Sequence, residues 1–303
     1  MAPRRVLVTG ASGQLGHDLV AALSGEVPAG GLAKDVRTGR LGDRPATDVV
    51  AAPHAVLDVT RREDVLTAIE ALRPQVVIHA AAFTAVDECE RDPDRAFGVN
   101  ALGTRHVAEA SRRYGAHLVV LSTDYVFEGN ANRPYVEWDE TRPLSVYGRS
   151  KLGAEQEAGS GATIVRTSWL SGHHGKNIVR TILELSSTDA PLRFVDDQRG
   201  SPSFCADVAG AVLTLADARL GGVYHVTNGG DASWYEFARA VLTAAGKNPA
   251  RVEPVLTSGL VPPRPAPRPA YSVLDNAAMR LSGLPLLPPW EDALARLVGA
   301  IEI

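Results

Sequence analysis

A tyrosine and a lysine in the segment SVYGRSKLGAE are the residues whose types and spacing point most directly to chemistry. Tyr147 and Lys151 are four positions apart, so on a helix they share one face, about one turn apart. A nearby ammonium lowers the pKa of a phenol, which can then give or take a proton near neutral pH. The pair alone is a weak signal, because the same spacing occurs by chance in many helices.

The segment HLVVLSTDYVF predicts a buried strand that carries hydroxyl groups toward this tyrosine. Ser122 and Thr123 lie at its carboxyl end. One hydroxyl there could hydrogen-bond a substrate carbonyl and share the negative charge that develops on its oxygen. We favour Thr123, because Ser122 is one pleat step away and faces the other side of the strand. Tyr125 and Tyr135 are rival phenols, but neither has a lysine at helical spacing.

A glycine-rich loop near the start of the chain predicts a nucleotide-binding turn. Residues Val6–Thr9 are apolar and β-branched without alternation, as in a buried parallel strand, and the helical pattern HDLVAALSG follows the loop. The spacing is G-x-x-G-x-x-G rather than G-x-G-x-x-G. Its uses are similar: Gly10 allows a tight turn, Gly13 a close approach of backbone to a pyrophosphate, and Gly16 close packing of helix on strand. Backbone N–H groups at the helix start would hold the phosphates.

The second predicted strand, DVVAAP, bears on the choice between NADPH and NADH. It follows a segment rich in Gly, Pro and charge at residues 25–48, which we interpret as a surface insertion. Pro53 and His54 stand where such folds usually have a carboxylate for the ribose hydroxyls. Because no carboxylate would repel a 2′-phosphate, the pattern favours NADPH, with NADH possible. Arginines that could supply a positive charge are Arg37, Arg40, Arg61 and Arg62.

Two further segments are expected beside the adenosine. We predict a short strand in VLDV with Asp58 at its end, either near the adenine amino group or simply next to a helix start. A strand at Val76–Ile78 precedes Ala80, Ala81 and Ala82. Small side chains there leave room for a flat nucleotide in the crevice of a doubly wound sheet, although a plain apolar strand end would look the same.

Asn100 falls inside the helical pattern DPDRAFGVNALGTRHVAEASRRYG. Asn is unfavourable in a helix interior, so this position indicates a specific hydrogen-bonding duty. Support of Lys151 through a water molecule is one such duty.

The order of these patterns predicts the fold. Strands alternate with helices from residue 4 to about 166, which is typical of a doubly wound parallel α/β sheet of Rossmann type. We assign residues 1–170 to a dinucleotide-binding domain, to which about 205–227 return. Residues 171–303 mainly form a smaller C-terminal α/β substrate lobe, with helices near 176–187, 233–245 and 289–300.

Composition excludes several classes of function. The chain has 303 residues and a net charge of −4 without a basic run, which argues against nucleic acid as a partner. Cys89 and Cys205 lack metal-ligand spacing, which favours a reduced, cytoplasmic protein. No apolar run approaches the roughly 18 residues of a membrane span, and no signal peptide precedes the first strand.

Six segments in this order carry a resemblance to a known family: GASGQLG, HAAAFTAVDECE, STDYVFEG, PLSVYGRSKLGAE, VRTSWL and DDQRGSP. They are similar to the dTDP-4-dehydrorhamnose reductases, extended short-chain dehydrogenase/reductases that complete the synthesis of dTDP-L-rhamnose. The resemblance covers nearly the whole chain except the insertion. It implies NADPH-dependent reduction of the C4 ketone of dTDP-4-dehydro-L-rhamnose, with the hydride coming from the nicotinamide.

The resemblance also implies a role for each matching residue. Tyr147 would give the proton to the C4 oxygen, with Lys151 as its partner and ribose ligand and Thr123 as second donor. Cofactor contacts are implied for Gly10, Gly13, Gln14, Leu15, Gly16, Asp58, Val59, Ala80, Ala81, Ala82, Asn100, Tyr147 and Lys151. Substrate contacts are implied for Thr84, Val86, Asp87, Thr123, Asp124, Trp169, Asn177 and Arg268.

The last three of these residues have specific implied places. Trp169 would line the sugar pocket, Asn177 would lie near the phosphates, and Arg268 would bind the pyrophosphate unless it is merely a solvated arginine in a proline-rich loop. Some relatives are dimers bridged by magnesium through carboxylates on the first helix, where Asp18 lies. Because no partner for Asp18 can be matched, we predict no metal, and a homodimer is possible.

Three other functions stay open. The same chemistry could act on another nucleotide-linked deoxysugar, such as one of an antibiotic or dihydrostreptose-type pathway. A sugar-nucleotide epimerase or dehydratase would recycle tightly held NAD, and Asp124 beside Thr123 leaves room for it. Relatives of this fold also serve as non-catalytic regulatory partners of methionine adenosyltransferase, against which the intact Thr, Tyr and Lys argue.

Overall fold

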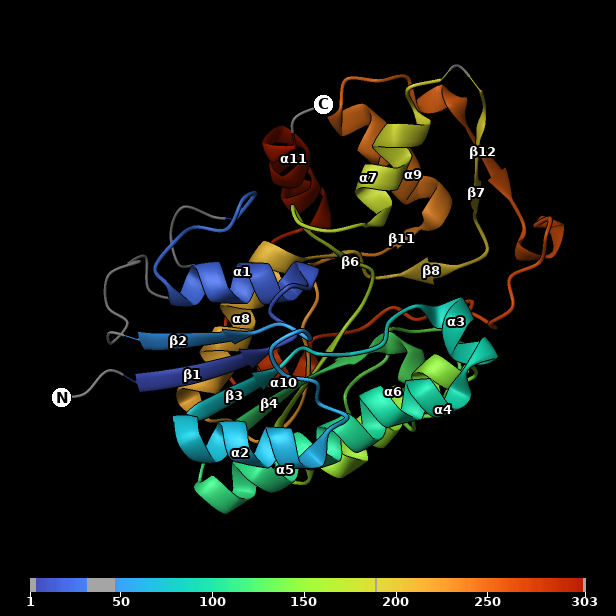
Figure 1. Cartoon of the computed structure of the whole chain (residues 1–303). Coiled ribbons are helices and arrows are strands. Elements are labelled where there is room, and N and C mark those ends of the chain that lie inside the picture. Colours follow the sequence, from blue (N-terminus) through green and yellow to red (C-terminus); the bar gives the residue numbers. More distant parts are fainter. Residues whose placement is uncertain (1–3, 32–46, 189, 302–303) are drawn as a thin grey trace.

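A six-stranded parallel sheet forms the centre of the molecule (Figure 1). The computed structural model describes residues 4–31, 47–188 and 190–301. The strands run in the order β10-β5-β4-β3-β1-β2, so the order reverses between β1 and β3. In doubly wound sheets, ligands bind at the carboxyl ends of the strands at such a reversal. The strand bounds are β1 (Arg4–Thr9), β2 (Thr47–Ala52), β3 (Val76–His79), β4 (His117–Thr123), β5 (Thr163–Thr167) and β10 (Gly222–His225).

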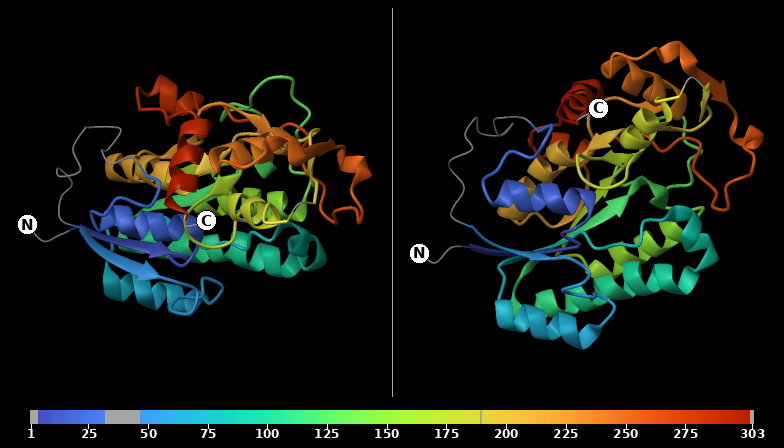
Figure 2. Two further views of the ribbon diagram at one scale, coloured as in Figure 1. Left: turned by 90° about the horizontal axis from the view of Figure 1, so that it is seen from above. Right: turned by 45° about the horizontal axis from the view of Figure 1, so that its top comes forward.

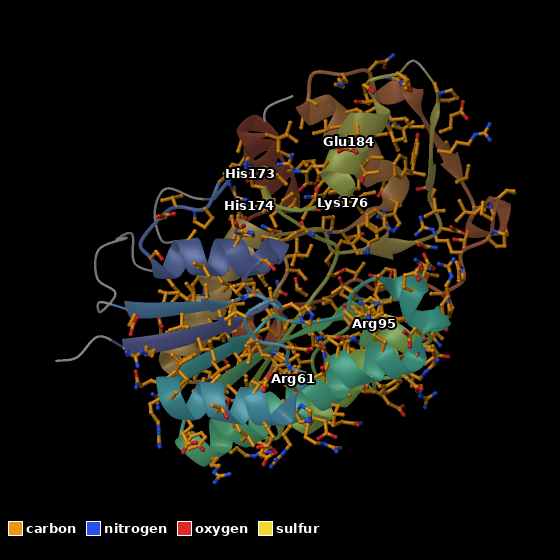
Figure 3. All side chains as sticks on the ribbon, in the orientation of Figure 1. Arg61, Arg95, His173, His174, Lys176 and Glu184 are labelled. Atoms are coloured by element: carbon orange, nitrogen blue, oxygen red, sulfur yellow. The ribbon has the colours of Figure 1, made fainter. Side chains whose placement is uncertain are left out.

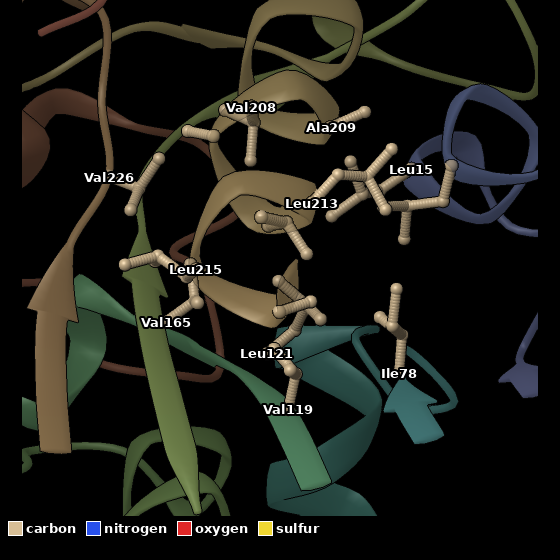
Figure 4. Close-up of a cluster of buried hydrophobic side chains, with 14 of the residues drawn as sticks. Leu15, Ile78, Val119, Leu121, Val165, Val208, Ala209, Leu213, Leu215 and Val226 are labelled. Carbon is tan, nitrogen blue, oxygen red and sulfur yellow. The ribbon is translucent and has the colours of Figure 1, made fainter. Parts of the chain in front are cut away.

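Helices cover both faces of this sheet, as Figures 1 and 2 show. One face is covered by α1 (Gln14–Leu23) and α8 (Cys205–Ala218), and the other by α2 (Arg62–Leu72), α5 (Gly103–Tyr114) and α6 (Val146–Ala158). Figure 4 shows the core between α1, α8 and the sheet. In β1, Val6 and Val8 enter that core whereas Leu7 enters the opposite one. Both faces are therefore buried, which explains the unbroken apolar run.

The strand register brings the candidate residues to one edge. Thr9 at the end of β1 pairs with His79 at the end of β3, and Thr123 at the end of β4 pairs with Thr167 of β5. The loops after β1, β3 and β4 therefore leave the sheet side by side, because all strands are parallel. The predicted doubly wound α/β fold is confirmed.

A second hydrophobic core lies in a smaller lobe above the sheet edge (Figure 1). It is formed by α7 (Ile178–Leu185), α9 (Trp234–Ala244) and α11 (Trp290–Ala300), with β7 (Leu192–Val195) paired to β12 (Val252–Val255). Strand β10 and helix α8 belong to the large sheet and its cover. These contacts support a domain boundary near residue 170, which we keep as a proposal.

Several short helices and strands complete the fold. They are α3 (Val86–Arg91), α4 (Pro93–Phe97), α10 (Ala277–Leu281), β6 (Leu170–Ser171) paired with β9 (Ser203–Phe204), and β8 (Arg199–Gly200) paired with β11 (Ala232–Ser233). Of these, α3 and α4 pack on α6, and α10 packs on β10. No helix in the described ranges is both long enough and apolar enough to cross a membrane.

One local prediction was wrong, and another missed a detail of a helix that is present. The segment VLDV is not a strand: the N–H groups of Val56 and Leu57 both donate to the carbonyl of Pro53, which closes a turn directly after β2. The helix predicted to contain Asn100 is interrupted by a π-helical turn at Gly98–Leu102, between α4 and α5. Such turns in helices are frequent at functional sites. Arg37 and Arg40 lie outside the described residues.

Candidate active site

The glycine loop lies directly against the end of β3. Gly10 has φ +67°, and a Cβ on it would lie 2.5 Å from the backbone nitrogen of Ala81. Only glycine permits both the left-handed backbone and this close approach. Helix α1 then begins without a side-chain cap at Gly13, so its first backbone N–H groups have no intrahelical partner and are suited to phosphate.

Gln14 and Leu15 in this first turn point in different directions. The Oε1 of Gln14 accepts a hydrogen bond of 3.1 Å from the backbone nitrogen of Gly172, which ties α1 to the start of the smaller lobe. The side chain of Leu15 is buried in the core under α8 (Figure 4). Leu15 therefore offers a cofactor its backbone rather than its side chain.

The tyrosine is delivered by the first turn of α6. Ser145 caps this helix by accepting a hydrogen bond from the nitrogen of Gly148. Tyr147 is 9% exposed, and its phenol is hydrogen-bonded to the hydroxyl of Thr123. The ring of Tyr125 meets it edge to face, with 5.6 Å between centroids. The end of β4 and the start of α6 thus place the predicted hydroxyl and phenol together.

The titration of this pair differs from the prediction. Burial raises the pKa of Tyr147, although the hydroxyl of Thr123 opposes the rise. Burial also lowers the pKa of Lys151 to about 8, against the attraction of Glu155. The ammonium of Lys151 donates to the carbonyl of Leu121 at 2.6 Å. The phenol pKa is therefore not lowered as predicted, because desolvation of the buried phenol is the largest influence on it. A phenol with a raised pKa is fully protonated near neutral pH, as a proton donor must be.

Asn100 in the π-helical turn is wholly satisfied by hydrogen bonds. Its Nδ2 donates to the hydroxyl of Ser150 at 2.8 Å and to the carbonyl of Phe83, while its Oδ1 accepts from the nitrogen of Phe83. Ser150 in turn donates to the carbonyl of Tyr147. Asn100 thus links the loop after β3 to α6, at the helical turn of α6 that runs from Tyr147 to Lys151.

Asp124 is buried beside Thr123. Its Oδ2 accepts from the hydroxyl of Ser272 at 2.5 Å, and its Oδ1 accepts from Thr123 at 3.0 Å. Burial raises the pKa of Asp124 to about 6, although these hydroxyls lower it in part. The residue therefore connects the end of β4 to the segment before α10.

Asp87 and Arg268, both predicted substrate ligands, bind each other. Two nitrogens of Arg268 reach the two oxygens of Asp87 at 2.6 and 2.8 Å. Arg268 also hydrogen-bonds the phenol of Tyr125, and Arg264 lies close enough to lower the pKa of Asp87 as a minor cause after Arg268. This places two guanidinium groups and one carboxylate next to the aromatic neighbour of Tyr147. Thr84 is exposed and Val86 half-buried just before, at the start of α3.

Trp169 lies on the lobe side of the site, in a strained backbone with φ +46°. Its ring stacks on Trp234 of α9 at 3.5 Å and packs against Gly200, where a Cβ would lie 2.6 Å from the indole nitrogen. Asn177 caps α7 by accepting from the nitrogen of Arg180 and donates to the carbonyl of Gly172.

The segment between Trp169 and α7 contacts the first helix. The ring of His174 stacks on that of His17 of α1, and Figure 3 shows His173 and His174 between α1 and α7. A cavity of about 620 Å³ lies along this segment, and it is lined by His173, His174, Gly175, Lys176, Asn177, Arg180, Thr181 and Glu184.

Asp58 and Val59 lie apart from the tyrosine, in the turn between β2 and α2. Asp58 accepts hydrogen bonds from the nitrogen and hydroxyl of Thr60, and these bonds lower its pKa. The carbonyl of Val59 contacts the ring of His106 in α5 at 2.9 Å. In the described residues, no group of three or more His, Cys, Asp or Glu side chains could hold a metal.

Comparison with known proteins identifies the family. The model of the RmlD substrate binding domain family matches residues 4–303. The chain belongs to this family. It is 40% identical over 306 residues to the dTDP-4-dehydrorhamnose reductase of Streptomyces griseus, covering 98% of this chain and 94% of the relative. It is also 40% identical over 295 residues to a probable dTDP-4,6-dihydroxy-2-methyloxan-3-one 4-ketoreductase of Streptomyces antibioticus, covering 96% and 93%.

A solved structure of the family agrees over the whole chain. The dTDP-4-dehydrorhamnose reductase of Bacillus anthracis, in complex with NADP, has a TM-score of 0.87 and 35% identity, and the match covers 99% of this chain and 100% of that one. The resemblance drawn from the six segments is therefore confirmed, and with it the expectation of an oxidoreductase of this family. The NADP in the Bacillus anthracis relative supports the predicted cofactor.

Four residues near the site had no predicted role. Ser150 joins Asn100 to α6, and Arg264 accompanies Arg268. Glu155 of α6 and Arg166 of β5 form a buried ion pair. Glu155 could have been found from its spacing, because it is four residues after Lys151 and on the same helix face. Arg166 had a weaker signal, a lone charge inside an apolar strand pattern.

Proposed function

We propose that this protein is a dTDP-4-dehydrorhamnose reductase that uses NADPH to reduce the C4 ketone of dTDP-4-dehydro-L-rhamnose to dTDP-L-rhamnose. The observation that carries the proposal is the buried contact of Tyr147 with Thr123. Tyr147 is on the same helix as Lys151, and the contact lies at the sheet edge that carries the glycine loop.

The cofactor would lie along the carboxyl edge of the sheet and supply the hydride when bound. The N-terminus of α1 would hold its pyrophosphate, Ala80 to Ala82 and the Asp58–Val59 turn its adenosine, and Lys151 its ribose. Pro53 and His54 follow β2 without a carboxylate at that point. NADPH is therefore favoured, with NADH possible. Arg62 is held by two hydrogen bonds to Glu109 and Arg61 by one ion pair with Asp64, whereas the ring of exposed His54 is 3.9 Å from Asp58. His54 and then Arg61 are therefore the candidates for a 2′-phosphate.

The protein residues carry the proton and the negative charge. Tyr147 gives its phenol proton to the C4 oxygen as the ketone is reduced. Thr123 donates a hydrogen bond to the same oxygen, without transferring its proton, while the ammonium of Lys151 stabilises the phenolate. The close contact of Thr123 with the phenol supports this division of work.

The substrate would bridge the two lobes. Arg268 and Arg264 would bind its diphosphate, because the carboxylate of Asp87 neutralises only one of these two guanidinium groups. Trp169 would present its ring to the sugar, and Asn177, Thr84, Val86, Asp87 and Asp124 would complete the contacts. A homodimer and a cytoplasmic location stay predictions.

The proposal is tested by a coupled assay. dTDP-4-keto-L-rhamnose, made in place by the upstream dehydratase and epimerase, is mixed with the protein and NADPH or NADH, and the loss of reduced nicotinamide is followed. Keto-sugar-dependent oxidation that yields dTDP-L-rhamnose supports the proposal and ranks the cofactors. In the same assay Tyr147→Phe should lose about 10²–10⁴ in turnover, as for loss of a general acid, and still bind NADPH. Tyr114→Phe, at the end of α5, is the control and should keep wild-type turnover.

A second candidate is a 4-ketoreductase for another dTDP-linked deoxysugar. It is favoured by the Streptomyces antibioticus relative, which is as similar as the Streptomyces griseus one. Oxidation with another 4-keto sugar but not with dTDP-4-keto-L-rhamnose would select it. Purified protein that carries bound NAD and consumes no NADPH would indicate an epimerase. Protein that binds NADPH and reduces no keto-sugar would indicate a regulatory partner.

A further inference from the structure

A buried carboxylate lies one turn beyond the catalytic lysine. Glu155 is 7% exposed. Its Oε1 accepts from the hydroxyl of Ser122 at 2.5 Å and from the Nε of Arg166 at 2.9 Å, and its Oε2 accepts from an Nη of Arg166 at 2.7 Å. Arg166 is 4% exposed and comes from β5. Both oxygens of Glu155 are thus held, by groups from two neighbouring strands.

Two successive turns of α6 hydrogen-bond two successive residues of β4. Lys151 donates to the carbonyl of Leu121, and Glu155 accepts from the hydroxyl of Ser122. Tyr147, Lys151 and Glu155 are each four residues apart, so they follow one another along one helix face. The position of the Lys151 ammonium at the carbonyl of Leu121 is therefore part of a row of contacts between α6 and β4, and Glu155 makes the last of them.

A buried ion pair needs a reason, because apolar residues of similar size usually stabilise a fold as well or better. Here the charges are arranged as two cations, Lys151 and Arg166, with the Glu155 carboxylate on the same helix face as Lys151 and paired to Arg166. Burial of Lys151 alone would favour its neutral form. A fixed negative charge one turn away offsets that loss, whereas an apolar residue could not.

We propose that Glu155 is a positioning residue for the reaction: its carboxylate, fixed by Arg166 and Ser122, holds Lys151 as an ammonium ion and in place at the carbonyl of Leu121, one helical turn from Tyr147. This rests on the proposed function for the part played by Lys151 and Tyr147 in catalysis. It does not rest on which dTDP-sugar is the substrate.

Other titratable groups near this row of contacts come from several elements. His79 of β3 faces Lys151, Arg166 contacts the carbonyl of Glu137 and influences His225, and Asp124 faces Tyr147. Burial lowers the pKa of His79 and of His225 to about 3, so both are neutral near pH 7. Asp124 titrates at about pH 6 and thus belongs to the acidic side of a pH profile. The alkaline side is left to Lys151, whose pKa is about 8.

The test observes the lysine directly. The chain has four lysines, Lys34, Lys151, Lys176 and Lys247, so protein labelled with ¹³C at the lysine ε-carbon gives a simple NMR spectrum, assigned with Lys151→Met. In Glu155→Gln the amide can still accept hydrogen bonds but carries no charge. We expect the titration of Lys151 to move to lower pH by about one unit, the order expected for loss of a nearby opposite charge. The alkaline limb of kcat should move with it.

Glu157→Gln is the matched control. Glu157 is on the same helix and is also paired with an arginine, Arg105, but this pair is on the surface. Loss of the Glu157 charge should leave both the Lys151 titration and the pH profile of kcat unchanged. Glu155→Asp, which keeps the charge, should restore most of the wild-type titration.

The outcomes separate the two proposals. An unchanged Lys151 titration in folded Glu155→Gln would overturn the inference and leave Glu155 a purely structural residue. A shifted Lys151 titration together with full activity of Tyr147→Phe would uphold the charge relation and overturn the proposed function instead. If Glu155→Gln fails to fold because Arg166 loses its partner, Glu155→Gln/Arg166→Gln removes both charges and is measured in its place. The expected shift is then in the same direction but smaller, because a cation is removed together with the carboxylate, and no shift would overturn the inference.

Discussion

Replacement of Gly16 by alanine tests whether the helix–loop contact at the nucleotide site is as tight as the structure shows. In most helices this change is favourable, by about 1 kcal/mol, because alanine has the higher helix propensity. In α1, however, a Cβ on Gly16 would lie 2.3 Å from the carbonyl oxygen of Gly10 and 2.8 Å from the Cα of Ala11. The helix would have to move by about 1 Å to restore ordinary contact, so the sign should reverse.

The expected size follows from two opposing effects. Overpacking of a close-packed site costs about 1–3 kcal/mol, and the gain in propensity offsets about 1 kcal/mol of that. Gly16→Ala should therefore lower the free energy of unfolding by about 0–2 kcal/mol, instead of raising it by about 1 kcal/mol, and should not gain in Tm. The displaced N-terminus of α1 should also weaken NADPH binding, by about tenfold or more, because its backbone N–H groups are proposed to hold the phosphates.

The control is Gly210→Ala in α8, where a Cβ would meet nothing within 4 Å. That variant should gain about 0.5–1 kcal/mol and bind NADPH like the wild type. Thermal unfolding gives the two Tm values, and nicotinamide fluorescence titration gives the two dissociation constants. If Gly16→Ala proves as stable as Gly210→Ala and binds NADPH with unchanged affinity, the close approach of α1 to the loop is refuted.

Two further variants test buried and paired charges. Asp18 in α1 is buried with an unpartnered Oδ2, and burial raises its pKa to about 7. Because this folded pKa lies above the unfolded value of about 3.8, ionisation of the carboxyl destabilises the folded state. That loss of stability is absent below about pH 4 and complete above pH 7. Asp18→Asn should therefore raise Tm at pH 8, by an amount equivalent to up to about 4 kcal/mol, and leave Tm at pH 4 nearly unchanged; equal effects at both pH values would contradict this. Arg268→Gln should raise KM for the dTDP-sugar about 10- to 100-fold, as expected for lost charge-assisted hydrogen bonds, and change kcat much less. Arg133→Gln, which removes a surface pair with Asp139, should change neither, and a similar KM for both variants would remove Arg268 from the phosphate site.

Much of the site was predictable because its parts are local in the chain. The strand, glycine loop and helix at residues 4–23 follow from periodicity and from the backbone needs of glycine. The spacing of Tyr147 and Lys151 sets them on one helix face whatever surrounds the helix. The choice of Thr123 over Ser122 followed from strand alternation, and the structure places Thr123 at the phenol and Ser122 at Glu155.

The predictions that failed depended on the surroundings of a residue rather than on its spacing in the chain. VLDV has strand-like residues, but it follows β2 too closely, and the chain must turn there to reach α2. The lysine was expected to lower the phenol pKa, but the depth of burial, which spacing does not reveal, reverses the direction. The predicted roles of Asp87 and Arg268 as separate substrate ligands did not foresee that the two side chains bind each other.

The sequence by itself determined the order of elements, the nucleotide-binding turn, the tyrosine–lysine pair and the family. These depend on residue spacing within single elements, which the period of a helix or strand translates directly into position. Only the tertiary structure decided that Glu155 pairs with Arg166, that Arg268 closes on Asp87, and that α1 lies within contact of the Gly10 carbonyl. Each of these joins elements that are distant in the chain or depends on packing at sub-ångström scale, and chain spacing carries no information on either.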